Sequence, residues 1–272
     1  QIIASVVPIY LQPVRKLQVD EEFFRERLTS ASLSERYAAA KALRFSGFTA
    51  SRIDLQKRML DPDEDIYVQL EAAAALAAHD DSSGWKFLAS AVNSPFLTVQ
   101  LETVIVISEI EAEQSEQLLI NVLTDTQRDS EIRAGAAWGL GEFQTQRAAD
   151  ALINTFNVNS LDIKVEAARA LLRIAGPQIH HLTDTLEKAS PENRDGLAWV
   201  LARSGGFDIA RLAYHQNDTN LRYWLSYIVG YGRVSFTEEQ IKALCEIDSE
   251  VYFAASVLWQ LLNSWIYNLR EY

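Results

Sequence analysis

A nine-residue pattern that recurs along the chain constrains its fold more than any other feature of the sequence. The pattern is an apolar residue, a long polar residue, two variable residues, two small residues, one variable residue, a small residue and an aliphatic residue. We number these positions 1 to 9. Clear copies occupy 35–43, 68–76, 99–107, 132–140 and 163–171, and weaker copies occupy 193–201, 221–229 and 250–258. Their last residues lie 28 to 33 residues apart, and a fixed period of this size is the signature of a repeat protein.

Each copy predicts one amphipathic helix, which we call the A helix. Positions 1, 5, 8 and 9 are apolar or small, and this spacing places them on a single buried stripe of a helix. A second helix, the B helix, is predicted in each unit, as in 84–93, 115–125 and 147–157. Turns are expected after the A helices where glycine or acidic residues occur. These turns are Gly47, His79 to Asp81, Gly176, Gly205 with Gly206, and Gly232.

The sequence predicts one continuous array over residues 1–272. The chain has only 11 Gly and 6 Pro and contains no linker rich in Gly, Ser or Pro, so nothing marks a domain boundary. Residues 20–30 are predicted to form a B helix, which makes 1–30 a partial N-terminal repeat, and 250–272 is expected to form a C-terminal cap. The apolar start, 1–11, lacks the basic region and the length of a signal peptide or membrane span. Because no Met precedes it, we expect a processed chain or part of a larger protein.

The unit of about 30 residues with its small-residue core resembles the short HEAT-like repeats of the phycobilisome (bilin) lyase type, and 132–143 is the closest match. The resemblance implies an all-α fold, an α-solenoid of about eight helix pairs. It implies two classes of function, because such repeats occur in adaptors, in docking arrays of larger proteins and in bilin lyase subunits. The leading hypothesis is a non-catalytic protein-interaction scaffold. The alternative is a subunit of a bilin (phycobiliprotein) lyase or a chromophore-handling protein, in which aromatic side chains flank a tetrapyrrole.

The charge of the chain limits its partners. The sequence has 37 Asp and Glu against 25 Lys and Arg, a net charge of −12. Such a chain repels nucleic acids and anionic membranes, so the expected partner is a protein with a basic or apolar patch. Cys245 is the single cysteine, which rules out an intrachain disulfide and fits a reducing, cytoplasmic location. The oligomeric state does not follow from the sequence.

No catalytic, metal or cofactor site is expected. The four histidines include no His-Glu dipeptide, which iron-binding HEAT-like deoxyhypusine hydroxylases repeat. No phosphate-binding or nucleophile motif occurs, and Cys245 is interpreted as an ordinary core residue of a B helix. The acidic run 61–65 is interpreted as a solvated turn.

Positions 4 and 7 suggest the binding face. They lie on one side of each A helix and are predicted to reach solvent, because they carry charged residues such as Lys41, Glu71, Glu102 and Glu166. In the second half of the chain this face is aromatic, and Gly135 and Gly196 at position 4 are expected to leave room beside a ring. We hypothesise a partner-binding stripe of Trp138, Arg169, Trp199, Trp224 and Tyr227. The alternative is that these tryptophans pack within the array, and full burial of Trp138 and Trp199 would exclude the stripe.

Position 2 carries a long polar residue in seven copies. These residues are Arg36, Gln69, Gln100, Arg133, Lys164, Arg194 and Arg222. They form either a basic ladder for an acidic ligand or a set of bridges to loop acids of neighbouring repeats. We favour the bridges, because the excess of acids lies in the adjacent loops.

Overall fold

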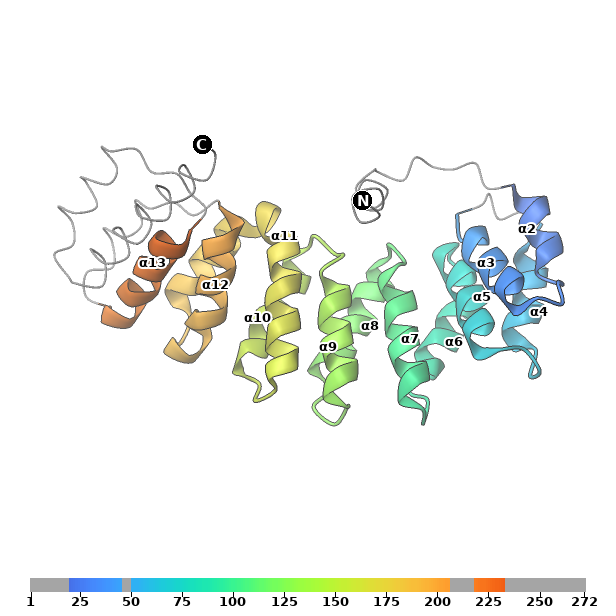
Figure 1. Cartoon of the computed structure of the whole chain (residues 1–272), viewed down its shortest axis with the longest axis horizontal. Coiled ribbons are helices and arrows are strands. Elements are labelled where there is room, and N and C mark those ends of the chain that lie inside the picture. The colour runs from blue at the N-terminus through green and yellow to red at the C-terminus, as the bar shows by residue number, and fades with distance from the viewer. Residues whose placement is uncertain (1–19, 46–49, 206–217, 233–272) are drawn as a thin grey trace, which may run out of the picture. The chain divides into compact units, whose positions relative to one another are not determined.

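The computed structural model describes residues 20–45, 50–205 and 218–232 (Figure 1). Within these ranges the regular structure is entirely helical, which confirms the all-α prediction. The chain divides into two compact units, 1–112 and 113–272, which we describe separately. No helix in the described ranges has the length and apolar content needed to cross a membrane.

The first unit is built around α5. Its A helices are α3 (Leu33–Leu43), α5 (Ile66–Ala78) and α7 (Leu97–Ser108), and its B helices are α2 (Glu21–Arg27), α4 (Arg52–Leu60) and α6 (Ser82–Ala91). Helix α5 packs against α3, α4, α6 and α7. Residues 72–77 of α5 are all buried, and α6 crosses them closely at Gly84, where an added Cβ would lie 2.4 Å from the carbonyl oxygen of Ala73. The prediction that small residues permit close helix packing is confirmed here.

The second unit follows the same plan as far as α10. It contains α8 (Glu113–Thr124), α9 (Ser130–Leu140), α10 (Gln146–Asn154), α11 (Leu161–Lys188), α12 (Arg194–Ser204) and α13 (Thr219–Tyr231). Two short 3-10 helices, η1 (Thr155–Asn157) and η2 (Pro191–Asn193), lie before α11 and α12. Helix α11 packs against α9, α10 and α12, and α12 packs against α13. The A helices of this unit therefore follow one another as packed neighbours (Figure 1).

The repeat pattern located the A helices correctly. The seven copies from 35–43 to 221–229 fall on α3, α5, α7, α9, α11, α12 and α13, and the predicted B helices correspond to α6, α8 and α10. The turn at 79–81 is confirmed, with Asp80 in the left-handed region at φ 60°. Gly205 closes α12 with φ 78°, as predicted for a helix-ending glycine.

The turn predicted at Gly176 is wrong, because α11 runs without interruption from Leu161 to Lys188 and includes Pro177. Proline clashes with the Cβ of a preceding helical residue, and Gly176 has no Cβ. The buried residues Ile174, Ala175, Leu182 and Leu186 continue the apolar stripe beyond the proline. Burial of this stripe favours one long helix over a helical hairpin.

Several predictions fall outside the described ranges. They concern the copy at 250–258, the cap at 250–272, residues 1–19 of the partial repeat, Gly47, Gly206 and Cys245. Residues 20–30 do contain the predicted helix, α2. The single continuous array over 1–272 stays a prediction.

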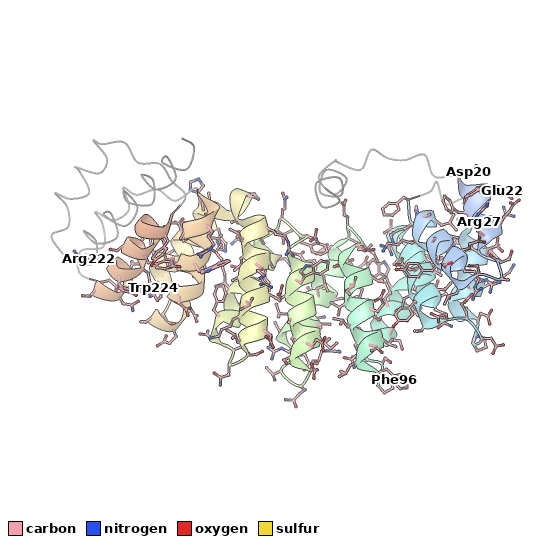
Figure 2. The ribbon with its side chains drawn as sticks, viewed as in Figure 1. Asp20, Glu22, Arg27, Phe96, Arg222 and Trp224 are labelled. Atoms are coloured by element: carbon pink, nitrogen blue, oxygen red, sulfur yellow. The ribbon has the colours of Figure 1, made fainter. Side chains whose placement is uncertain are left out.

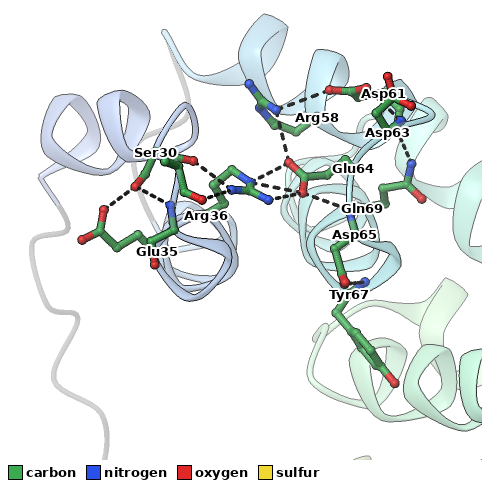
Figure 3. Close-up of polar contacts among 12 residues, drawn as sticks. Ser30, Glu35, Arg36, Arg58, Asp61, Asp63, Glu64, Asp65, Tyr67 and Gln69 are labelled. Atoms are coloured by element: carbon green, nitrogen blue, oxygen red, sulfur yellow. Dashed lines mark hydrogen bonds and ion pairs between the residues drawn. The ribbon is translucent and has the colours of Figure 1, made fainter.

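The bridges to loop acids that we favoured at position 2 are confirmed for two residues, Arg36 and Arg194. Arg36 donates to both carboxylate oxygens of Glu64, which also accepts from Arg58 at 3.2 Å (Figure 3). Arg194 binds Asp218 in the same way, at 2.9 and 3.1 Å. Three others donate instead to a backbone carbonyl oxygen of the preceding loop or helix end; these are Gln69 to Asp61, Gln100 to Ser94 and Arg133 to Leu123. The solvated-turn interpretation is wrong for Glu64, whose side chain is only 1% exposed because two arginines neutralise it.

Candidate functional site

A cavity of about 570 Å³ lies across α11, α12 and α13. We call it the aromatic cavity. It brings together four of the five predicted stripe residues, Arg169, Trp199, Trp224 and Tyr227. Its other lining residues are Phe156, Leu161, Lys164, Val165, Ala168, Asp195, Gly196 and Tyr223. Figure 2 shows Trp224 on α13, at the orange end of the described chain.

The lining follows the repeat pattern, because most of these residues occupy positions 3, 4 and 7 of their A helices. Sequence reasoning identified positions 4 and 7 but missed position 3, which contributes Val165, Asp195 and Tyr223. Position 3 precedes position 7 by four residues, and residues at this spacing share a helix face. The helical period of the stripe was therefore a signal that could have identified them.

The aromatic side chains of α13 contact one another edge to face. The ring centroid of Trp224 lies 5.0 Å from that of Tyr223 and 5.8 Å from that of Tyr227. The Nε1 atom of Trp224 is buried and has no hydrogen-bond acceptor among the residues described. Such T-shaped contacts hold the rings in a fixed arrangement, so α13 gives the cavity a preformed aromatic wall.

Trp199 is the aromatic side chain that α12 contributes to the cavity. It is half-buried, and the guanidinium carbon of Arg203 lies 4.1 Å from its ring centroid. Arg203 also donates a hydrogen bond to the carbonyl oxygen of Trp199 at 3.3 Å. A cation over an indole ring is attracted by the ring quadrupole, which holds Trp199 in place at the cavity.

Three charged side chains line the aromatic cavity. Arg169 is 62% exposed and pairs with Glu166 at 2.6 Å within α11. Asp195 accepts a hydrogen bond from the backbone amide of Gly196 at 2.7 Å. Within the described part of the chain the ammonium group of Lys164 has no hydrogen bond or ion pair, so Lys164 differs from the position-2 residues that fasten loops.

Trp138, the fifth predicted residue, does not line the cavity. It is 38% exposed, and the guanidinium carbon of Arg173 lies 5.7 Å from its ring centroid while Arg173 donates to its carbonyl oxygen. Neither Trp138 nor Trp199 is fully buried, so the outcome that would exclude the stripe is not observed. The five-residue stripe stays a prediction, and the cavity collects four of its members.

The room expected beside Gly196 is filled by the protein itself. A Cβ at Gly196 would lie 2.7 Å from the ring of Phe156, which is only 3% exposed. The glycine is therefore required for packing of η1 against α12. The space where its Cβ would lie is therefore not open to a ligand, although Gly196 also lines the aromatic cavity.

Positions 4 and 7 of the A helices in the first unit carry charged residues. We predicted that Glu71 reaches solvent, and this prediction is wrong. The Glu71 side chain is fully buried and pairs with Arg44 and, at 3.4 Å, with Lys41. Glu109 accepts from both bases, at 2.9 Å from Lys41 and 2.8 Å from Arg44. Arg44 follows position 9 directly, and its buried guanidinium supplies the counter-charge that makes the burial of Glu71 tolerable. The nine-residue pattern does not include Arg44 and could not have indicated this.

The described ranges contain no group of three or more His, Cys, Asp or Glu side chains that could hold a metal ion. His181, on α11, pairs instead with Asp150 of α10, with Nε2 and Oδ1 2.7 Å apart. This pair joins two helices, and no third ligand lies beside it among the described residues.

Comparison with solved structures finds similarity at low sequence identity. The chain is similar to the complex of CpcE and CpcF of phycocyanin lyase from Nostoc sp., with 18% identity, 87% of this chain and 97% of that chain covered, and a TM-score of 0.40. It is also similar to human deoxyhypusine hydroxylase in complex with glycerol, with 14% identity, 77% and 94% covered, and a TM-score of 0.41. An engineered protein shows 19% identity, with 90% and 96% covered, and a TM-score of 0.33.

A family model described as HEAT repeats matches residues 86–172 and 119–202. No curated protein matches the sequence. The HEAT match covers the helices from α6 to α12 and confirms the repeat type predicted from the nine-residue pattern. The fold is thus an α-solenoid, with HEAT repeats over the matched residues.

Proposed function

We propose that the chain is a non-catalytic protein-interaction scaffold, alone or as the docking region of a larger protein, and that it binds its partner at the aromatic cavity. The observation that carries the proposal is the convergence of Arg169, Trp199, Trp224 and Tyr227 on one cavity of about 570 Å³. Tryptophan, tyrosine and arginine supply much of the binding energy in protein interfaces. A preformed cavity lined by them suits an apolar anchor of a partner.

Exposed apolar side chains at the cavity support the proposal. Leu161 is 73% exposed, Tyr223 46% and Val165 36%. Scattered apolar residues on a surface need no explanation, but a contiguous group around a cavity indicates an interaction site. The expected partner surface is an apolar patch, with Arg169 and Lys164 available for polar contacts beside it.

Affinity capture from cell lysate tests the proposal, with the wild-type chain compared to Trp199→Ala and Tyr223→Ala variants. We expect one dominant protein with the wild type and at least fivefold less of it with either variant. Phe96→Ala is the matched control, because Phe96 is an aromatic residue 67% exposed directly before α7 (Figure 2) and lies outside the cavity. Circular dichroism of each variant verifies that the helices are retained. Equal capture by wild type and both cavity variants would contradict the proposal.

Two further outcomes are informative. Weaker capture by Trp138→Ala would extend the site from the cavity to the full five-residue stripe. A visible absorption band of a bilin together with a captured phycobiliprotein would overturn the scaffold proposal in favour of the chromophore-handling alternative.

A further inference from the structure

A second cavity, of about 580 Å³, lies in the first unit. It spans the A helices α3, α5 and α7, and we call it the acidic cavity. Its lining residues are Ser32, Leu33, Ser34, Tyr37, Asp65, Tyr67 and Glu102. Both charged residues of this lining are acids, whereas the aromatic cavity contains two bases and one acid. Tyr37 and Glu102 occupy positions 3 and 4 of their repeats, as in the aromatic cavity, but the other lining residues lie before position 1 of their copies.

Glu102 is a carboxylate with no direct ion pair to any of the described residues. It is half-buried at position 4 of α7, and it has no hydrogen bond or ion pair within the ranges the structure describes. Burial raises the pKa of Glu102, and the nearby carboxylate of Glu71 raises it further. Lys41, whose charge acts in the opposite direction, is already held by Glu71 at 3.4 Å and by Glu109 at 2.9 Å. A cation entering the cavity would therefore find an unneutralised carboxylate.

The remaining lining suits an organic cation. Tyr67 is 40% exposed and Leu33 45%, and Tyr37 adds a second ring. Asp65 accepts a hydrogen bond from the amide of Tyr67 at 2.9 Å, which fixes its carboxylate at the start of α5. Aromatic rings attract cations through their faces, and the aliphatic part of a long side chain packs on apolar surface. A bare metal ion fits less well, because the described residues offer no group of three ligands.

We propose that the acidic cavity binds a lysine or arginine side chain from a basic segment of a partner protein. The charged end lies between Glu102 and Asp65, and the aliphatic stem packs on Leu33 and the tyrosine rings. The excess of acids over bases in the chain, 37 against 25, favours the approach of such a segment. This site belongs to the first unit, and its occupation does not depend on the aromatic cavity being a binding site.

Isothermal titration calorimetry with a defined probe tests the inference. The probe is the peptide acetyl-(Gly-Arg)4-amide, and the peptide with citrulline in place of arginine is its uncharged control. We expect the arginine peptide to bind and the citrulline peptide to bind at least tenfold more weakly. Glu102→Gln should weaken binding of the arginine peptide at least fivefold, and Tyr67→Leu should weaken it about threefold through loss of the ring.

Asp63→Asn is the matched control, because it removes one negative charge from an exposed loop position outside the cavity. It should change the affinity less than twofold. Glu102→Gln removes an unpaired, half-buried carboxylate, so this variant should remain folded. Equal weakening by Glu102→Gln and Asp63→Asn would reduce the interaction to general electrostatic attraction and overturn the inference. Absence of binding, or equal binding of the two peptides, would overturn it as well.

Discussion

Arg36 on α3 donates to both carboxylate oxygens of Glu64, with Nε 2.9 Å from Oε2 and Nη2 2.9 Å from Oε1. The two residues are 28 positions apart, so this pair joins one A helix to the loop before the next. The glutamate side chain is 1% exposed. Removing its partner should therefore cost more stability than breaking an ion pair on the surface.

Arg36→Ala should lower the free energy of unfolding by about 2–3 kcal/mol, because it leaves a buried carboxylate with Arg58 as its remaining base. Urea denaturation followed by circular dichroism measures the change. Arg52→Ala is the control, since Arg52 is 58% exposed and its partner Asp81 keeps the hydrogen bonds from Ser83. It should cost less than about 1 kcal/mol. An equal loss of unfolding free energy in both variants would show that burial of Glu64 does not increase the contribution of its ion pair to stability.

The same pair predicts a pH dependence. Burial alone would raise the pKa of Glu64, but hydrogen bonds from Arg36, the Asp65 amide and Arg58 outweigh it and lower the pKa. An acid whose pKa is lower in the folded state adds stability above its unfolded pKa and loses it as the pH falls through the folded pKa. The stability difference between wild type and Arg36→Ala should thus shrink between about pH 7 and about pH 3. Denaturation curves over this range test it, and a constant difference would contradict it.

Substitution of two position-4 glutamates in successive A helices, Glu71 and Glu102, should affect stability differently. Glu71→Gln should destabilise the chain by about 3 kcal/mol, because it leaves buried Arg44 with one carboxylate partner, Glu109. Glu102→Gln should leave stability unchanged or raise it at neutral pH, because the raised pKa of Glu102 means that its ionised form is disfavoured in the folded state. Thermal unfolding of the two variants at neutral pH compares them directly. Destabilisation by both would show that Glu102 has a stabilising partner.

Gly196→Ala should destabilise the second unit by about 1–3 kcal/mol, because the new methyl group overlaps the ring of Phe156. Replacing Phe156 with the smaller leucine tests whether this overlap causes the destabilisation. The Gly196→Ala and Phe156→Leu changes combined should cost less than the sum of the two single costs, since the leucine makes room for the methyl group. Urea denaturation of the three variants measures the coupling, and strict additivity would show that the two residues do not contact.

The fold could be predicted from the sequence because one buried stripe repeats with a fixed period. Positions 5 and 6 are small in each clear copy except 99–107, and this places α3, α5, α9 and α11 without knowledge of their neighbours. What could not be predicted depends on neighbours from other parts of the chain. The burial of Glu71 depends on Arg44, one residue beyond the pattern, and the role of Gly196 depends on Phe156 in η1.

The candidate site was predictable to a similar extent. The helical period placed Arg169, Trp199, Trp224 and Tyr227 on one face, and these four residues line the aromatic cavity. Position 3 was missed because its residues differ in type, an aliphatic, an acid and an aromatic, and only the packing of three helices makes them one surface. Trp138 and Trp199 both occupy position 7 of their repeats, but only Trp199 lines the aromatic cavity. The same repeat position can therefore have different neighbours in different repeats.

The position-2 bonds have a consequence for how such a chain can gain or lose whole repeats. Each of those described joins an A helix to the loop or helix end directly before it or to the loop before the next A helix. The bonds of Gln69, Gln100 and Arg133 go to backbone carbonyl oxygens, which any inserted or remaining repeat would also supply, whereas Arg36 and Arg194 each need a particular acid before the next A helix. The two cavities behave differently, because each is assembled from three consecutive A helices. The proposed binding cavities therefore depend on the order of the repeats, whereas the backbone bonds of position 2 do not.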